Sequence, residues 1–149
     1  MKYFIFILIA SFVWDTLCSQ QVYFNKRYDH DNSLEVIWSI LETDSGYLCA
    51  TGTGKVLMMK LDSFGSISWK KEYGDSIYYY YVAASGSMVQ TFDGGYAVNG
   101  GRESGTNASN VGMLWRFDAN GDTLWTSAFG STTNYFETFY QCKQTPDSG

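Results

Sequence analysis

The chain contains few basic residues, one histidine and three cysteines. Its 10 lysines and arginines are outnumbered by 15 acidic residues, which argues against nucleic-acid binding, because phosphates demand a basic surface. The single histidine, His30, has no second histidine or cysteine near it, so the sequence supports neither a zinc site nor a Ser-His-Asp triad. Three cysteines are too few for a disulfide scaffold. We predict no cofactor.

Charged residues are also scarce relative to apolar ones. They make up 17% of the 149 residues, against 18% aromatic and 45% hydrophobic residues. Intrinsic disorder requires the opposite balance, few aromatics and a high charge per residue. The composition therefore predicts a folded chain with enough apolar material for one core of ordinary domain size.

The N-terminus has the layout of a secretory signal peptide. Lys2 precedes an apolar run over residues 3–13, and polar residues follow. The run is too short to span a bilayer as a helix. We predict a signal peptide over residues 1–19, with cleavage near Ser19, and a secreted or cell-surface protein without a transmembrane helix after cleavage. Two alternatives are lipidation of Cys18 and a buried N-terminal strand.

Removal of the signal peptide leaves two cysteines. Cys49 and Cys142 each lie in an apolar, strand-like run, and they occupy different positions in the repeats described next. We predict that both are buried free thiols.

The rest of the chain repeats itself about every 50 residues. Residues 60–74 match residues 116–130 without a gap, and each matched pair is 56 positions apart. A second element, residues 42–47, recurs at 90–96 and begins again at 144–149. The predicted units are residues 25–74, 75–130 and 131–149, and we expect the array to continue beyond the third, incomplete unit. The residues that define the repeat are Asp62, Gly65, Trp69, Asp93, Gly95, Asp118, Gly121 and Trp125.

Each unit is predicted to contain four short antiparallel strands. In the first unit these are residues 38–43, 47–51, 56–61 and 66–73, with glycine-containing hairpin turns after the first and third strands. No segment beyond the signal peptide has helical apolar spacing. Four-stranded repeats of this length predict an all-β fold, a partial β-propeller whose blades stack face to face. Trp69 and Trp125 would then pack between neighbouring blades.

Binding residues are expected at one end of the sheets. The tight turns share one end, whereas the connections at the other end vary, as in residues 52–54 and 101–110. The segment 74–87, predicted as a linker, belongs to that variable end and carries four consecutive tyrosines. An alternative is that every second tyrosine packs between blades. The candidate ligand-binding residues are Tyr78, Tyr79, Tyr80, Tyr81, Arg102, Glu103 and Asn107.

One turn has a weak resemblance to a calcium loop. Asp118, Asn120 and Asp122 place oxygen-bearing side chains at alternate positions, but the twelfth position is Phe129 rather than glutamate. A structural turn is therefore the preferred interpretation. Asn107 also begins a glycosylation sequon. No pair of carboxylates can be singled out for glycoside hydrolysis.

The second unit has a sequence pattern that resembles a known group. The pattern consists of Asp93-Gly94-Gly95-Tyr96, Gly100-Gly101, Trp115-Arg116-Phe117-Asp118, Asn120-Gly121-Asp122, Trp125 and Phe129-Gly130. Over residues 25–149 the chain is similar to repeats of secreted bacterial β-propeller-like proteins exported by the type IX secretion system. That resemblance implies export to the cell surface or medium and assigns no catalytic residue. Kelch repeats and pyrroloquinoline-quinone-type repeats are more distantly similar.

These observations favour an exported, non-catalytic propeller module that binds an extracellular glycan or protein. The alternatives are the propeller part of a secreted polysaccharide-degrading enzyme, with its catalytic residues elsewhere in a longer chain, and a structural spacer.

Overall fold

The computed structural model contains nine strands and no helix among the residues that it describes, which confirms the predicted all-β class for them. No helix in this part of the chain is long and apolar enough to cross a membrane. The predicted signal peptide, Cys18 and His30 lie outside the described residues. The described residues are 24–29, 36–52, 54–84, 86–104, 107–130 and 137–147.

The first sheet is a four-stranded antiparallel meander in which each strand pairs with the next along the chain. The predicted strands of the first unit are confirmed to within a residue or so at their ends. The first turn depends on Gly46, whose φ of 129° is unfavourable for other residues and whose missing side chain leaves room for the backbone of Leu61. The strands are β1 (Ser39–Thr43), β2 (Gly46–Gly52), β3 (Val56–Leu61) and β4 (Ile67–Tyr73).

The second sheet repeats this order with one difference. Its first position is divided between two short strands, both of which pair antiparallel with the same neighbour, β7. From there the meander continues to the outer strand, β9. The strands are β5 (Tyr78–Val82), β6 (Met88–Gln90), β7 (Tyr96–Ser104), β8 (Asn107–Phe117) and β9 (Thr123–Phe129).

Two predicted loops are strands in the structure. The tyrosine run in the predicted linker 74–87 forms β5, and most of the predicted loop 101–110 belongs to β7 and β8. Tyr80 lies opposite Arg102 and Tyr79 opposite Glu103. Glycine, serine and asparagine are poor strand formers, but ladder pairing on both sides of β7 outweighs that local preference.

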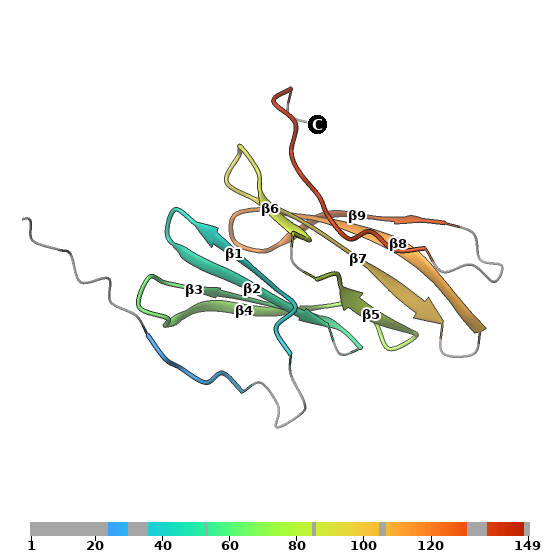
Figure 1. Cartoon of the computed structure of the whole chain (residues 1–149), viewed down its shortest axis with the longest axis horizontal. Coiled ribbons are helices and arrows are strands. Elements are labelled where there is room, and N and C mark those ends of the chain that lie inside the picture. The colour runs from blue at the N-terminus through green and yellow to red at the C-terminus, as the bar shows by residue number, and fades with distance from the viewer. Residues whose placement is uncertain are drawn as a thin grey trace, which may run out of the picture.

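The two sheets pack face to face around one apolar core (Figure 1). The outer strand β4 closes this core, because its Trp69 ring lies 6.5 Å from the ring of Tyr96 and its Tyr73 ring lies 4.5 Å from that of Phe117. The buried core residues are Leu48, Ala50, Val56, Met58, Tyr80, Val82, Met88, Tyr96, Val98, Val111, Met113, Trp115 and Phe117.

The turns between the third and fourth strands of the two sheets are built alike. The Asp62 carboxylate accepts hydrogen bonds from the amides of Phe64 (2.9 Å) and Ser66 (2.7 Å), and Asp118 accepts from the corresponding amides at the same two distances. These amide bonds, that from Ser66 above all, lower the pKa of Asp62. The Asp-x-x-Gly pattern thus selects the same turn twice. The tight turns lie together at one end of the sheets, on the left in Figure 1.

Both predicted free cysteines are unpaired thiols. Cys49 is buried on β2, as predicted. Cys142 is only half-buried, and its segment is not a strand as expected: the Cys142 amide donates to the Gly86 carbonyl oxygen (3.1 Å) without entering a ladder. Burial raises the pKa of the Cys142 thiol to about 11.

Candidate ligand-binding site

The four tyrosines of β5 point alternately to opposite faces of the second sheet, as strand geometry requires. Tyr80 is 5% exposed and packs in the core between the sheets, with Tyr78 partly buried against it. Tyr79 and Tyr81 lie on the other face, where Tyr79 is 44% exposed. One pair therefore stabilises the core, and the other pair lines a surface cavity.

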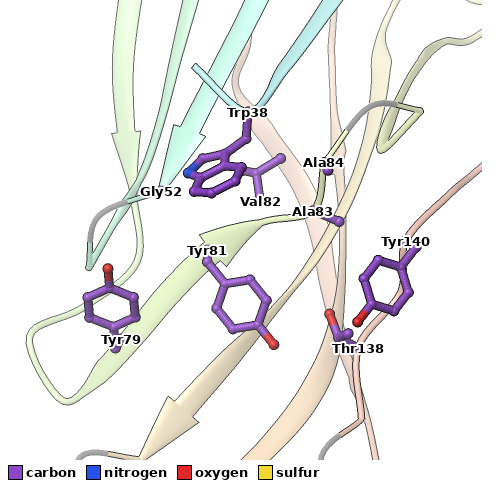
Figure 2. A pocket seen from close by; sticks show the side chains of 9 residues that line it. All are labelled: Trp38, Gly52, Tyr79, Tyr81, Val82, Ala83, Ala84, Thr138 and Tyr140. Carbon is purple, nitrogen blue, oxygen red and sulfur yellow. The ribbon is translucent and has the colours of Figure 1, made fainter. Parts of the chain in front are cut away.

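That cavity, which we name the aromatic pocket, has a volume of about 340 Å³. Figure 2 shows Trp38, Tyr79 and Tyr81 on its strand side and Tyr140 across from Tyr81, next to Thr138. Trp38 and Tyr140 are 49% and 67% exposed, so that solutes can reach their rings. The lining residues are Trp38, Gly52, Tyr79, Tyr81, Val82, Ala83, Ala84, Thr138 and Tyr140.

One wall of the pocket depends on close contact between the two sheets. Gly52 ends β2 directly against β5, and a Cβ at Gly52 would lie only 2.5 Å from the Tyr81 Cα. Glycine is therefore required for this approach. Trp38 precedes β1, and its amide donates to the Ala50 carbonyl oxygen (3.0 Å), which fixes the indole beside Gly52.

The opposite wall is an extended segment from the third predicted unit. The Thr138 hydroxyl and the Phe139 amide both donate to the Gly100 carbonyl oxygen, at 3.2 and 3.4 Å. The Phe139 ring lies 5.4 Å from the Phe129 ring of β9. These contacts hold Tyr140 at the pocket.

The pocket is apolar at its base, and its polar groups are few. The Tyr81 hydroxyl is enclosed above Gly101 and makes no hydrogen bond with any described residue. Burial raises the pKa of Tyr81. Exposed rings with hydroxyl edges around an apolar base suit a ligand with one apolar face and a hydroxyl-rich edge.

A second cavity of about 490 Å³ lies at the same end, between the sheets. Its lining includes one acidic and one basic side chain, Asp75 and Arg102, but both already have partners. Asp75 accepts from the Ile77 amide (2.9 Å), which lowers its pKa most, and also from the Tyr78 amide and the Tyr80 hydroxyl (3.1 Å each). The Arg102 guanidinium lies 4.3 Å from the Tyr78 ring centre. These contacts fix the entry of β5.

The structure thus separates the predicted binding residues. Tyr79 and Tyr81 line the aromatic pocket, whereas Tyr78, Tyr80 and Arg102 belong to the opposite face. Glu103 lies opposite Tyr79 in the ladder. Asn107 begins β8, and its side chain lies outside the described part.

Trp38 and Tyr140 were not among the predicted binding residues. Both occupy the same position of the repeat, four residues before the Glu42 and Gln144 that open the hairpin signature. The available signal was an aromatic residue at that position in the first and third units, where the second unit has Gly86. Its connection with the tyrosine run depends on how the sheets pack and is not encoded locally.

In the predicted turn at Asp118, both carboxylates are engaged by protein groups. The Asp118 carboxylate accepts from the Asn120 and Asp122 amides, and Asp122 forms an ion pair with Lys71 of the other sheet (2.6 Å). No cluster of three or more potential metal-binding side chains occurs in the described segments. The turn instead connects the two sheets.

The other repeat residues differ between the two units. Trp69 packs between the sheets, whereas Trp125 is 47% exposed on the outer face of the second sheet. The two carboxylate oxygens of Asp93 each accept a hydrogen bond from Nη2 of Arg116, at 2.6 Å. The Gly95 amide donates to the same carboxylate at 3.2 Å.

No family model and no curated protein matched the chain.

Proposed function

We propose that this chain is an exported, non-catalytic module of the β-propeller type that binds an extracellular carbohydrate in the aromatic pocket. The aromatic pocket carries the proposal. Its four rings, Trp38, Tyr79, Tyr81 and Tyr140, come from three segments that are distant in sequence. All of these rings except that of Tyr81 are exposed to solvent. Its volume is in the usual range for small-molecule sites.

Carbohydrate is favoured over a protein partner by the chemistry of the walls. A sugar ring has apolar C–H faces that stack on indole and phenol rings, and its hydroxyls can pair with the tyrosine and threonine hydroxyls at the pocket. The propeller type is supported by two successive antiparallel meanders, which have equivalent strand order, stack face to face and have matching turns. Export is supported by the sequence of residues 1–19 and by the resemblance to type IX secreted repeat proteins.

The proposal is tested by screening the purified protein on a glycan array and measuring affinities for the glycans bound. Trp38→Ala and Tyr140→Ala should each weaken binding at least about tenfold, because each removes a stacking surface. Phe92→Ala removes a ring that is 70% exposed at the opposite end and should leave binding unchanged. Equal affinity in all three variants, retention of only a protein partner, or hydrolysis of the glycan would contradict the proposal.

A further inference from the structure

Residues 24–28 lie against the face of the first sheet that is turned away from the second sheet. Cys49, Met59 and Leu61 form a small apolar cluster there, and Phe24 and Tyr28 pack against it. Their contacts reproduce, one by one, the contacts that β4 makes with the second sheet.

The first correspondence is an aromatic ring above a turn glycine. Phe24 occupies the space that a side chain at Gly65 would need, and Trp69 does the same at Gly121. Both glycines have a positive φ, 72° and 79°. They are equivalent residues of the two Asp-x-x-Gly turns.

The second correspondence is a hydroxyl bond to the same turn. The Tyr28 hydroxyl donates to the Gly65 carbonyl oxygen at 2.6 Å. The Tyr73 hydroxyl donates to the Gly121 carbonyl oxygen at 2.5 Å. Each tyrosine lies four residues after its turn-covering ring.

The third correspondence is a tilted pair of rings. Phe24 and Tyr47 have centroids 5.8 Å apart and planes at 63°. Trp69 and Tyr96 have centroids 6.5 Å apart and planes at 59°. Tyr47 and Tyr96 are themselves equivalent, since each directly follows the last glycine of the first hairpin turn of its unit.

The fourth correspondence is a lysine that reaches the residue after the turn glycine. Lys26 donates to the Ser66 hydroxyl (3.3 Å), and Lys71 contacts the Asp122 carboxylate (2.6 Å). The pattern aromatic-x-Lys-x-Tyr is therefore present at residues 24–28 and again at residues 69–73.

We propose that residues 24–28 are the outer strand of a further sheet and that they bind the open edge of a three-stranded unit of this same repeat. In both observed sheets the outer strand pairs with the third strand, β4 with β3 and β9 with β8. Residues 24–28 make no main-chain hydrogen bond to any described residue. Their placement on the first sheet leaves the main chain available for strand addition, a common mode of recognition.

The match also specifies the register of the bound strand. Phe24 corresponds to Trp125, so Arg27 corresponds to Ala128, which lies opposite Met113 of β8. A strand with the β8 sequence should therefore place its Met113 position opposite Arg27, and its Leu114 position one step away with the side chain on the other face.

Disulfide trapping tests this register. Protein carrying Arg27→Cys, an exposed position, is mixed in a glutathione redox buffer with a synthetic peptide of residues 107–118 carrying Met113→Cys. The peptide with Leu114→Cys instead is the off-register control, and a scrambled cysteine peptide sets the background. The proposal expects about tenfold more mixed disulfide with the Met113→Cys peptide than with the control.

The unsubstituted protein measures any reaction of its own thiols, and circular dichroism checks that Arg27→Cys folds. Adding Phe24→Ala should remove the register preference, because the strand then loses its contact with the first sheet. Equal trapping of both peptides, or trapping no higher than with the scrambled peptide, would overturn the proposal. Glycan binding through Trp38 is a separate readout and should not change in Arg27→Cys.

Discussion

The Trp69 indole lies directly against the backbone of Gly121, so that a Cβ at Gly121 would be 2.8 Å from the ring. This contact joins the outer strand of the first sheet to a turn of the second. Gly121 also has a φ of 79°, which other residues adopt only with strain. The glycine thus meets two independent requirements, one local and one from packing.

Gly121→Ala should therefore destabilise the fold more than a glycine replacement that meets only the local requirement. Gly94 is the matched control, since its φ is 82° and nothing lies within 4 Å of a Cβ there. Gly94→Ala should lower the free energy of unfolding by about 1 kcal/mol through strain. Gly121→Ala should lower it by roughly a further 1–3 kcal/mol through overpacking. Urea unfolding measures both, and equal losses would show that the ring moves aside without cost.

Tyr73→Phe should lower the free energy of unfolding by about 1 kcal/mol, because the Gly121 carbonyl oxygen loses its cross-sheet donor. Burial raises the pKa of Tyr73, so its hydroxyl stays protonated and the loss should be the same at neutral and mildly alkaline pH. Tyr79→Phe, at an exposed ring, is the control and should be neutral. A Tyr73→Phe variant as stable as the parent would show that the bond contributes nothing.

Asp93 should make the free energy of unfolding vary with pH in the acidic range. Hydrogen bonds from Thr91, then from Arg116 and the Gly95 amide, lower its pKa from 3.8 to about 2. Because the folded pKa lies below the unfolded one, the folded state binds the proton less readily. The stabilisation is complete above the unfolded pKa and is lost as pH falls from about 5 to about 2. The stability difference between parent and Asp93→Asn should shrink over that interval, and a constant difference would refute the assignment.

Cys49 and Cys142 should resist alkylation in the native state. Burial raises the pKa of Cys49 and raises that of Cys142 to about 11, so little thiolate forms near pH 8. Iodoacetamide labelling followed by peptide mapping should show both sites reacting far more slowly in native protein than in urea. Native labelling as fast as that of the unfolded chain would contradict the burial of Cys49 and the half-buried position of Cys142.

The sequence sufficed where the determinants of structure are local. The turns at Asp62 and Asp118 and the ends of β3 could be predicted, because an aspartate and a glycine at fixed spacing select the turn. β5 (Tyr78–Val82) was missed even though tyrosine and valine favour strands, because the local pattern does not show its pairing with β7, some 20 residues away along the chain.

The candidate site was accessible from sequence only in part. The tyrosine run was visible, but the division into Tyr79 and Tyr81 on one face and Tyr78 and Tyr80 on the other required the strand to be known. Trp38 reaches the pocket only because Gly52 allows the two sheets to approach. Contacts between segments of different repeats leave no mark in either segment alone.

The Tyr81 hydroxyl distinguishes a ligand site from a gap in packing. It is buried without a hydrogen bond to any described residue, so Tyr81→Phe should leave the ligand-free protein as stable as before or more stable, by up to about 1 kcal/mol. If a bound sugar displaces the groups that cover this hydroxyl and supplies the missing partner, the same change should weaken glycan binding about tenfold or more. Tyr79→Phe keeps its ring at the rim and tests whether an exposed hydroxyl matters equally. Thermal unfolding without glycan and titration with it measure the two effects. Lower stability together with unchanged affinity would assign Tyr81 to the core and remove it from the binding site.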